Sequence, residues 1–178
     1  MDRAVASHDA AAFGELYDRF VDRVYRYLYF RTGRHAEAED LTEQVFLKAW
    51  EAIGRYRWQG RPFLAWLYRL AHNVHIDHVR STRPTTSLST EHRTLEVPST
   101  TSMTEMARTL DADVIATALS QLTVEQQQVI VMKFIEGLDN EQIAQAMDRR
   151  EGAIRALQMR ALMSLRRVLE KLGEHGPA

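Results

Sequence analysis

Arginines alternate with aromatic side chains over residues 55–66, between two stretches of helical periodicity. Aromatic rings stack on unpaired bases and guanidinium groups contact phosphates, so this pattern can bind single-stranded nucleic acid. The same rings could instead be core residues. We expect Trp66 in the core, because it falls on an apolar helical stripe, and we leave both roles open for Tyr56, Trp58 and Phe63.

A second set of contact residues lies in the C-terminal half. Two helices joined by about three residues are predicted between Asp139 and Leu157, which is the spacing of a helix-turn-helix. Asp148 occupies the turn and tolerates the left-handed conformation required there. The basic residues that could reach base edges and phosphates are Lys133, Arg150, Arg155 and Arg160. The alternative is a helix pair with a charged outer face and no ligand.

Catalytic and metal-binding patterns are missing from the sequence. His72, His75 and His78 are spaced three apart, but positions six apart diverge around a helix, and no carboxylate completes a site. We therefore predict surface histidines beside DNA and no metal. The carboxylates of residues 37–43 have no histidine of the ligand type beside them, and there is no phosphate loop or nucleophile elbow. We expect neither an enzyme nor a cofactor.

The chain that must position these residues is segregated in charge, although its formal net charge is only −1. Residues 53–83 and 149–171 each carry five excess positive charges, whereas residues 111–148 hold seven acids and one base. Two basic patches suggest two surfaces that contact polyanions, and solvated helix faces are the alternative. The absence of cysteine and of long apolar stretches predicts a cytoplasmic protein with no membrane insertion.

The elements expected from periodicity are all helices. The predicted helices cover about 9–30, 41–53, 62–79, 108–121, a segment starting at 123, 139–147 and 151–173. Fifteen of the residues from 81 to 104 are Ser, Thr or Pro, which predicts a flexible linker. We therefore expect an all-α chain of two small domains, 1–80 and 106–178, joined by residues 81–105.

In this order the parts resemble the extracytoplasmic-function sigma factors of bacterial RNA polymerase. The N-terminal motifs are FGELY at 13–17, AEDL at 38–41, VFLKAW at 45–50, and WLYRLAHN at 66–73 followed by Ile76-Asp77. The C-terminal ones are Leu122 with Gln126, Gly137-Leu138, Ile143-Ala144, and Arg160-Ala161 with Leu165. The recognition helix departs from the family's usual pattern, because Ala153 and Ala156 stand where hydroxyl side chains are common.

The resemblance implies a region 2 helical bundle, a region 4 helix-turn-helix, and roles for matching positions. Docking on core polymerase would use Asp40, Leu41, Glu43 and Phe46. The unpaired bases of the −10 element would be bound by Tyr56, Arg57, Trp58, Arg61, Phe63, Asn73, Asp77 and Arg80. The duplex −35 element would be bound by Lys133, Arg150, Gly152, Ala153, Arg155, Ala156, Met159 and Arg160. An anti-sigma factor is the further partner implied.

Two other classes of function stay open at this point. A helix-turn-helix regulator would bind duplex DNA without polymerase, but it would have no use for a base-binding loop beside a docking helix. A hydrolase with a helical carboxylate site would need a metal constellation that the sequence does not contain.

Overall fold

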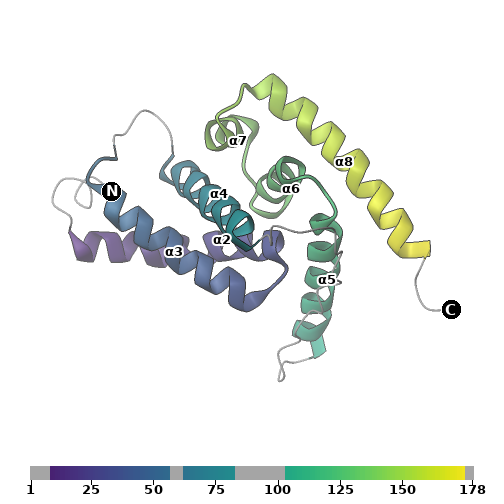
Figure 1. Cartoon of the computed structure of the whole chain (residues 1–178), viewed down its shortest axis with the longest axis horizontal. Helices are drawn as coiled ribbons and strands as arrows, with labels where there is room; N and C mark the ends of the chain where they lie inside the picture. Colours follow the sequence, from purple (N-terminus) through teal and green to yellow (C-terminus); the bar gives the residue numbers. More distant parts are fainter. Residues whose placement is uncertain (1–8, 57–61, 83–102, 175–178) are drawn as a thin grey trace.

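The computed structural model describes residues 9–56, 62–82 and 103–174, apart from the side chains of 103–111 and 173–174, and every regular element in these ranges is helical (Figure 1). The elements are α2 (Ala10–Thr32), α3 (His35–Ile53), α4 (Phe63–Thr82), α5 (Met103–Ser120), α6 (Val124–Ile130), the π-helix η1 (Val131–Ile135), α7 (Asn140–Met147) and α8 (Glu151–Glu174). The all-α prediction is confirmed.

Local capping residues account for the helix ends. Asp9 begins α2, and its side chain accepts hydrogen bonds from two backbone N–H groups of the first turn. Gly33 ends α2 in the left-handed region, with φ at 67°. The capping boxes predicted at Thr123 and Asp139 are both present and begin α6 and α7.

The N-terminal helices α2, α3 and α4 pack side by side as a bundle (Figure 1). Its interior includes aliphatic residues with no more than 1% of their surface exposed, among them Val24, Leu28, Leu41, Val45, Ile53 and Leu67. These positions recur at helical spacing along each element, so the apolar stripes meet and leave water together.

The C-terminal helices form a second set in which α8 lies across α6 and α7 (Figure 1). Ile143 of α7 and Ile154 of α8 are fully buried between them. The sequence did not predict η1, where the backbone of residues 131–135 widens into a π-turn after α6. Such turns shift the direction of the side chains that follow.

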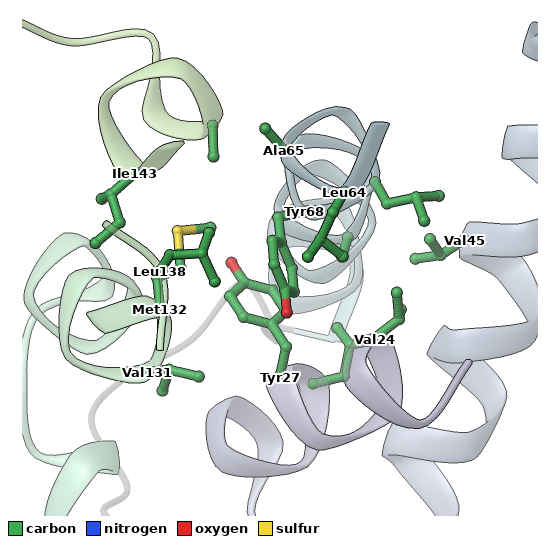
Figure 2. Packing of buried hydrophobic residues seen from close by; sticks show 14 of the residues in the cluster. Val24, Tyr27, Val45, Leu64, Ala65, Tyr68, Val131, Met132, Leu138 and Ile143 are labelled. Carbon is green, nitrogen blue, oxygen red and sulfur yellow. The ribbon is translucent and has the colours of Figure 1, made fainter. Parts of the chain in front are cut away.

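The two halves also pack on one another. In Figure 2, Tyr27 of α2 and Tyr68 of α4 lie opposite Val131, Met132 and Leu138 of the C-terminal half. All five residues are buried and belong to one hydrophobic cluster that extends through both halves. Among the described residues, no helix has the length and apolar character that crossing a bilayer needs.

Candidate nucleic-acid and protein interfaces

The helix-turn-helix is formed by α7, a three-residue turn and α8. Asp148 stands at the turn with φ 53° and ψ 47°, so the left-handed conformation predicted for it is confirmed. The N–H of Asp148 donates to the carbonyl of Ala144, and that of Arg149 donates to the same oxygen at 2.9 Å. These bonds give the Ala144 carbonyl, in the last turn of α7, its hydrogen-bond partners. The left-handed residue then lets the chain leave α7 and begin α8 in a different direction.

The outer face of α8 carries most of the residues predicted for the −35 element. Its exposed members are Gly152, Ala153, Arg155, Ala156, Met159 and Arg160, and Arg150 is exposed in the turn just before the helix. Lys133, in η1, is half-buried. Arg155 pairs with Glu151 at 3.1 Å, but both side chains are largely exposed, so this pair costs little to break. This arrangement offers a basic helix face of the kind that enters a major groove.

A polar strip lies on the outer face of α4. Asn73, Asp77 and Arg80 are exposed, and their spacing of four and three residues puts them on one face of the helix. Lys48 of α3 approaches the Asp77 carboxylate at 3.8 Å. The structure thus brings together three of the residues predicted for the −10 element.

The aromatic residues before and at the start of α4 form a buried cluster. The ring of Phe63 lies 5.7 Å from that of Tyr56 and 5.2 Å from that of Trp66. Tyr56 and Phe63 are 9% and 5% exposed, and burial raises the pKa of Tyr56. Of the two roles left open, the structure places both rings in the core, and Trp66 packs against it as expected. Contact with a base would require the rings to move.

The remaining residues predicted for this loop, Arg57, Trp58 and Arg61, lie outside the described residues.

The α3 residues predicted to dock on polymerase divide into two groups. Asp40 and Glu43 are exposed, whereas Leu41 and Phe46 are 1% and 5% exposed. The Phe46 ring packs edge-on against those of Phe13 and Tyr17, at 6.4 and 4.7 Å. Leu41 and Phe46 therefore lie on the inner face of α3 and pack in the hydrophobic core.

The exposed large apolar residue of α3 is Leu47, at 63%. The motifs in the sequence do not point to Leu47. It follows Asp40 by seven residues and Glu43 by four, so helical spacing puts all three on one face and could have identified it.

The histidines of α4 differ from one another. The prediction that all three lie on the surface is wrong for His75, which is 4% exposed. His72 is half-buried, and burial together with the nearby Arg31 guanidinium lowers its pKa to about 4. His78 lies 3.0 Å from the Glu37 carboxylate. Within the described ranges, no three acidic or histidine side chains converge as metal ligands.

Sequence reasoning also missed Glu136, which follows η1. Its side chain is fully buried against Arg23, Arg26 and Tyr68 of the N-terminal half. No local motif marks it.

Two known protein families match the chain, one in each half. Sigma-70 region 2 matches residues 16–85, and Sigma-70 region 4 matches residues 112–172. The extracytoplasmic-function (ECF) RNA polymerase sigma factor SigL of Mycobacterium tuberculosis is 33% identical over 171 residues, covering 94% of each chain.

The ECF sigma factor BldN of Streptomyces coelicolor is 39% identical over 95% of this chain, which spans 64% of BldN. A solved complex of the sigma factor RpoE with the anti-sigma factor NepR from Bartonella quintana shares the fold. Its TM-score is 0.66 at 18% identity, covering 89% of this chain and 97% of that one.

Proposed function

The chain belongs to the extracytoplasmic-function RNA polymerase sigma factors, and we propose that its two halves read separate elements of one promoter. Residues 1–80 and 106–178 act as the two recognition domains, joined by residues 81–105. The observation that carries this proposal is the presence of two separate exposed faces, the polar strip of α4 and the basic face of α8. A protein that binds only duplex DNA needs one of them.

Docking on core polymerase uses the outer surface of α3. Asp40, Glu43 and Leu47 provide two charges and an apolar side chain that a partner can cover. Leu41 and Phe46 hold this surface in position from the core side. Buried apolar area at the centre and charge around it are the usual features of a protein interface.

Recognition of the −10 element falls to α4 and to the segment before it. Asn73, Asp77 and Arg80 offer amide, carboxylate and guanidinium groups to the edges and phosphates of bases that have left the duplex. Extruding a base costs a few kcal/mol, and contacts that exist only with the extruded base offset this cost. Arg57, Trp58 and Arg61 belong to the same proposed surface.

Recognition of the −35 element falls to the first half of α8, which enters the major groove. Arg150, Arg155 and Arg160 contact phosphates and base edges there, and the short side chains of Ala153 and Ala156 allow close approach. The same reading places Gly152 and Met159 at the groove, with Lys133 beside it.

A protein that acts on the chromosome with RNA polymerase is located in the cytoplasm. The chain acts there as a regulatory subunit and brings no catalytic group or cofactor of its own.

An anti-sigma factor is the third partner. RpoE, which shares this fold, is known in complex with the anti-sigma factor NepR, and this likeness supports the proposal. Met159, Leu162 and Met163 leave 43–64% of their surface exposed on α8, an apolar area that a protein partner can cover.

The test is transcription from a promoter with core polymerase, on a duplex template and on one already mismatched at −10. Asn73→Ala should bind promoter fragments nearly normally and open the duplex poorly, as measured by permanganate footprinting. The mismatched template should restore transcription, because it supplies part of the opening energy.

Asp18→Ala, an exposed change on α2 outside the proposed surfaces, is the matched control and should behave as the wild type. If Asn73→Ala loses duplex binding but opens bound DNA normally, α4 is an ordinary duplex contact. The protein is then better described as a regulator that acts without polymerase.

A further inference from the structure

The recognition helix α8 packs on α6 and α7 through apolar side chains on one face (Figure 1). Ile154, Leu157 and Ala161 lie on this face and are no more than 4% exposed. Apolar contacts hold helices together but are not directional, so they leave some freedom in the rotation of α8 about its own axis. The side chains expected at the DNA groove need that rotation to be fixed.

Two side-chain hydrogen bonds join α8 to the helices beneath it. Gln158 Nε2 donates to Asn140 Oδ1 of α7 at 3.0 Å. Gln126 Nε2 of α6 donates to Ser164 Oγ of α8 at 3.2 Å. All four residues are half-buried, which strengthens both bonds relative to exposed ones. The Gln126 side chain also accepts from the Thr123 N–H, so the capping box of α6 holds the donor that reaches α8.

The two bonds lie on opposite borders of the buried face of α8. At about 100° per residue, Gln158 and Ser164 are about 120° apart around the helix. The buried residues Ile154 and Ala161 fall inside this arc, whereas Met159 falls outside it on the exposed face. Bonds placed in this way resist rotation in both directions, because turning the helix either way stretches one of them.

The rotation of α8 matters for base recognition. Side chains extend about 5–6 Å from a helix axis, so turning the helix by about 30° moves their ends by roughly 3 Å. Hydrogen-bond lengths vary by only about 0.5 Å. Such a displacement breaks bonds to a base edge, whereas a long, flexible arginine can still reach a phosphate.

A third polar contact, at the start of α8, is weaker. The Arg149 guanidinium donates to the Glu125 carboxylate of α6, but these side chains are 39% and 52% exposed. Exposed ion pairs contribute little, because solvent screens them and both side chains lose conformational freedom. The rotation of α8 therefore depends mainly on the two half-buried bonds.

We propose that Gln158 and Ser164 are positioning residues for promoter recognition: each fixes the rotation of α8 from one border of its buried face, without contacting DNA. The inference rests on the proposed function, because it takes the exposed face of α8 as the surface that reads the −35 element. Loss of either bond leaves the fold and the phosphate contacts in place and lowers the preference for the correct bases.

The test uses holoenzyme assembled from core polymerase and the full chain. Random-sequence duplexes bound by the wild type are sequenced to find its −35 motif. Affinities are then measured for the best duplex and for duplexes with one mismatched base pair in that motif, and their ratio gives the base preference.

Gln158→Met keeps the length and apolar stem of the side chain but cannot donate to Asn140. The ratio should fall roughly 2- to 10-fold, because the loss is limited to what one hydrogen bond contributes. The salt dependence of binding should stay unchanged, because the phosphate contacts remain. Ser164→Ala removes the bond on the other border and should also lower the ratio.

Changes at the partner residue separate positioning from direct contact with DNA. Asn140→Ala removes the acceptor and should lower the ratio as much as Gln158→Met does. The double variant should be no worse than either, because both changes remove the same bond. Asn140→Asp keeps an acceptor oxygen and should retain the wild-type ratio. Gln121→Met, at an exposed glutamine just after α5, is the matched control and should change nothing.

Four results would overturn the inference. If folded Gln158→Met and Ser164→Ala keep the wild-type ratio, these bonds do not fix the reading position, and the proposed function stands. If both variants weaken binding to every duplex equally and unfold at lower urea concentrations, the two residues are only structural. If the effects of Gln158→Met and Asn140→Ala add, these residues contact DNA separately. If wild-type holoenzyme selects no upstream motif, the proposed function itself fails and the positioning role fails with it.

Discussion

Replacing Leu47 by Ala should weaken binding to core polymerase without unfolding the protein. Burying a whole leucine side chain contributes about 1.5–3 kcal/mol, and 63% of Leu47 is available for a partner to cover. The expected loss is therefore about 1–2 kcal/mol, or roughly 5- to 30-fold in Kd. An exposed position of this kind should change the free energy of unfolding by no more than about 0.5 kcal/mol.

Phe46→Ala is the matched comparison, one residue away on the inner face of α3. Its ring is 5% exposed and packs on Phe13 and Tyr17, so truncation should cost about 3–5 kcal/mol of stability. That is a large share of the total stability of a small domain. Urea unfolding followed by circular dichroism, together with a titration of fluorescent protein with core polymerase, measures both quantities.

Two results would refute this reasoning. If Leu47→Ala binds core polymerase as tightly as the wild type, the outer face of α3 is not the docking surface. If Phe46→Ala keeps wild-type stability but loses binding, the ring is available to a partner and its placement in the core is wrong.

Three other changes test separate parts of the structure. Arg155→Ala should weaken binding to −35 duplex by about 1–3 kcal/mol and relax preference at one position, whereas equal loss on all sequences with a shallower salt dependence indicates a phosphate contact. Asp148→Gly should raise the melting temperature by about 2–4 °C, because it relieves about 1 kcal/mol of left-handed strain, whereas the ion pair with Arg69 that it removes is exposed and contributes little. An unchanged or lower value contradicts this. The pKa of His72 falls from an ordinary 6.5 to about 4 on folding, so between these values the unfolded chain binds the extra proton and the free energy of unfolding should drop as the pH falls. His72→Gln should flatten this drop in denaturant titrations at pH 7 and 5, and an equal drop in both proteins counts against burial as its cause.

Helix positions and ends follow local rules, and for this reason they could be predicted from the sequence. The capping boxes at Thr123 and Asp139 need only a side chain and the backbone three residues away. The left-handed turn at Asp148 depends on the steric limits of one residue. The exposed faces of α4 and α8 follow from helical periodicity, so most residues predicted to contact DNA lie on the surface expected for them.

Burial at a given position depends on what packs against it, and only the tertiary structure decided that. Phe46 and Leu47 are neighbours in a family motif, yet the bundle covers one and leaves the other exposed. The spacing of the α4 histidines predicted a surface position for His75, but the packing of α4 in the bundle buries it.

Glu136 shows the same limit over a longer range. Its partners Arg26 and Arg23 lie 110 and 113 residues away along the chain, so no sequence window contains the cluster. An isolated glutamate is normally solvated, because burying its charge costs more than local contacts return. Only the packing of one half on the other brings two guanidinium groups and a hydroxyl to the Glu136 carboxylate at once. An ordinary acidic residue thereby becomes a buried contact between the two halves.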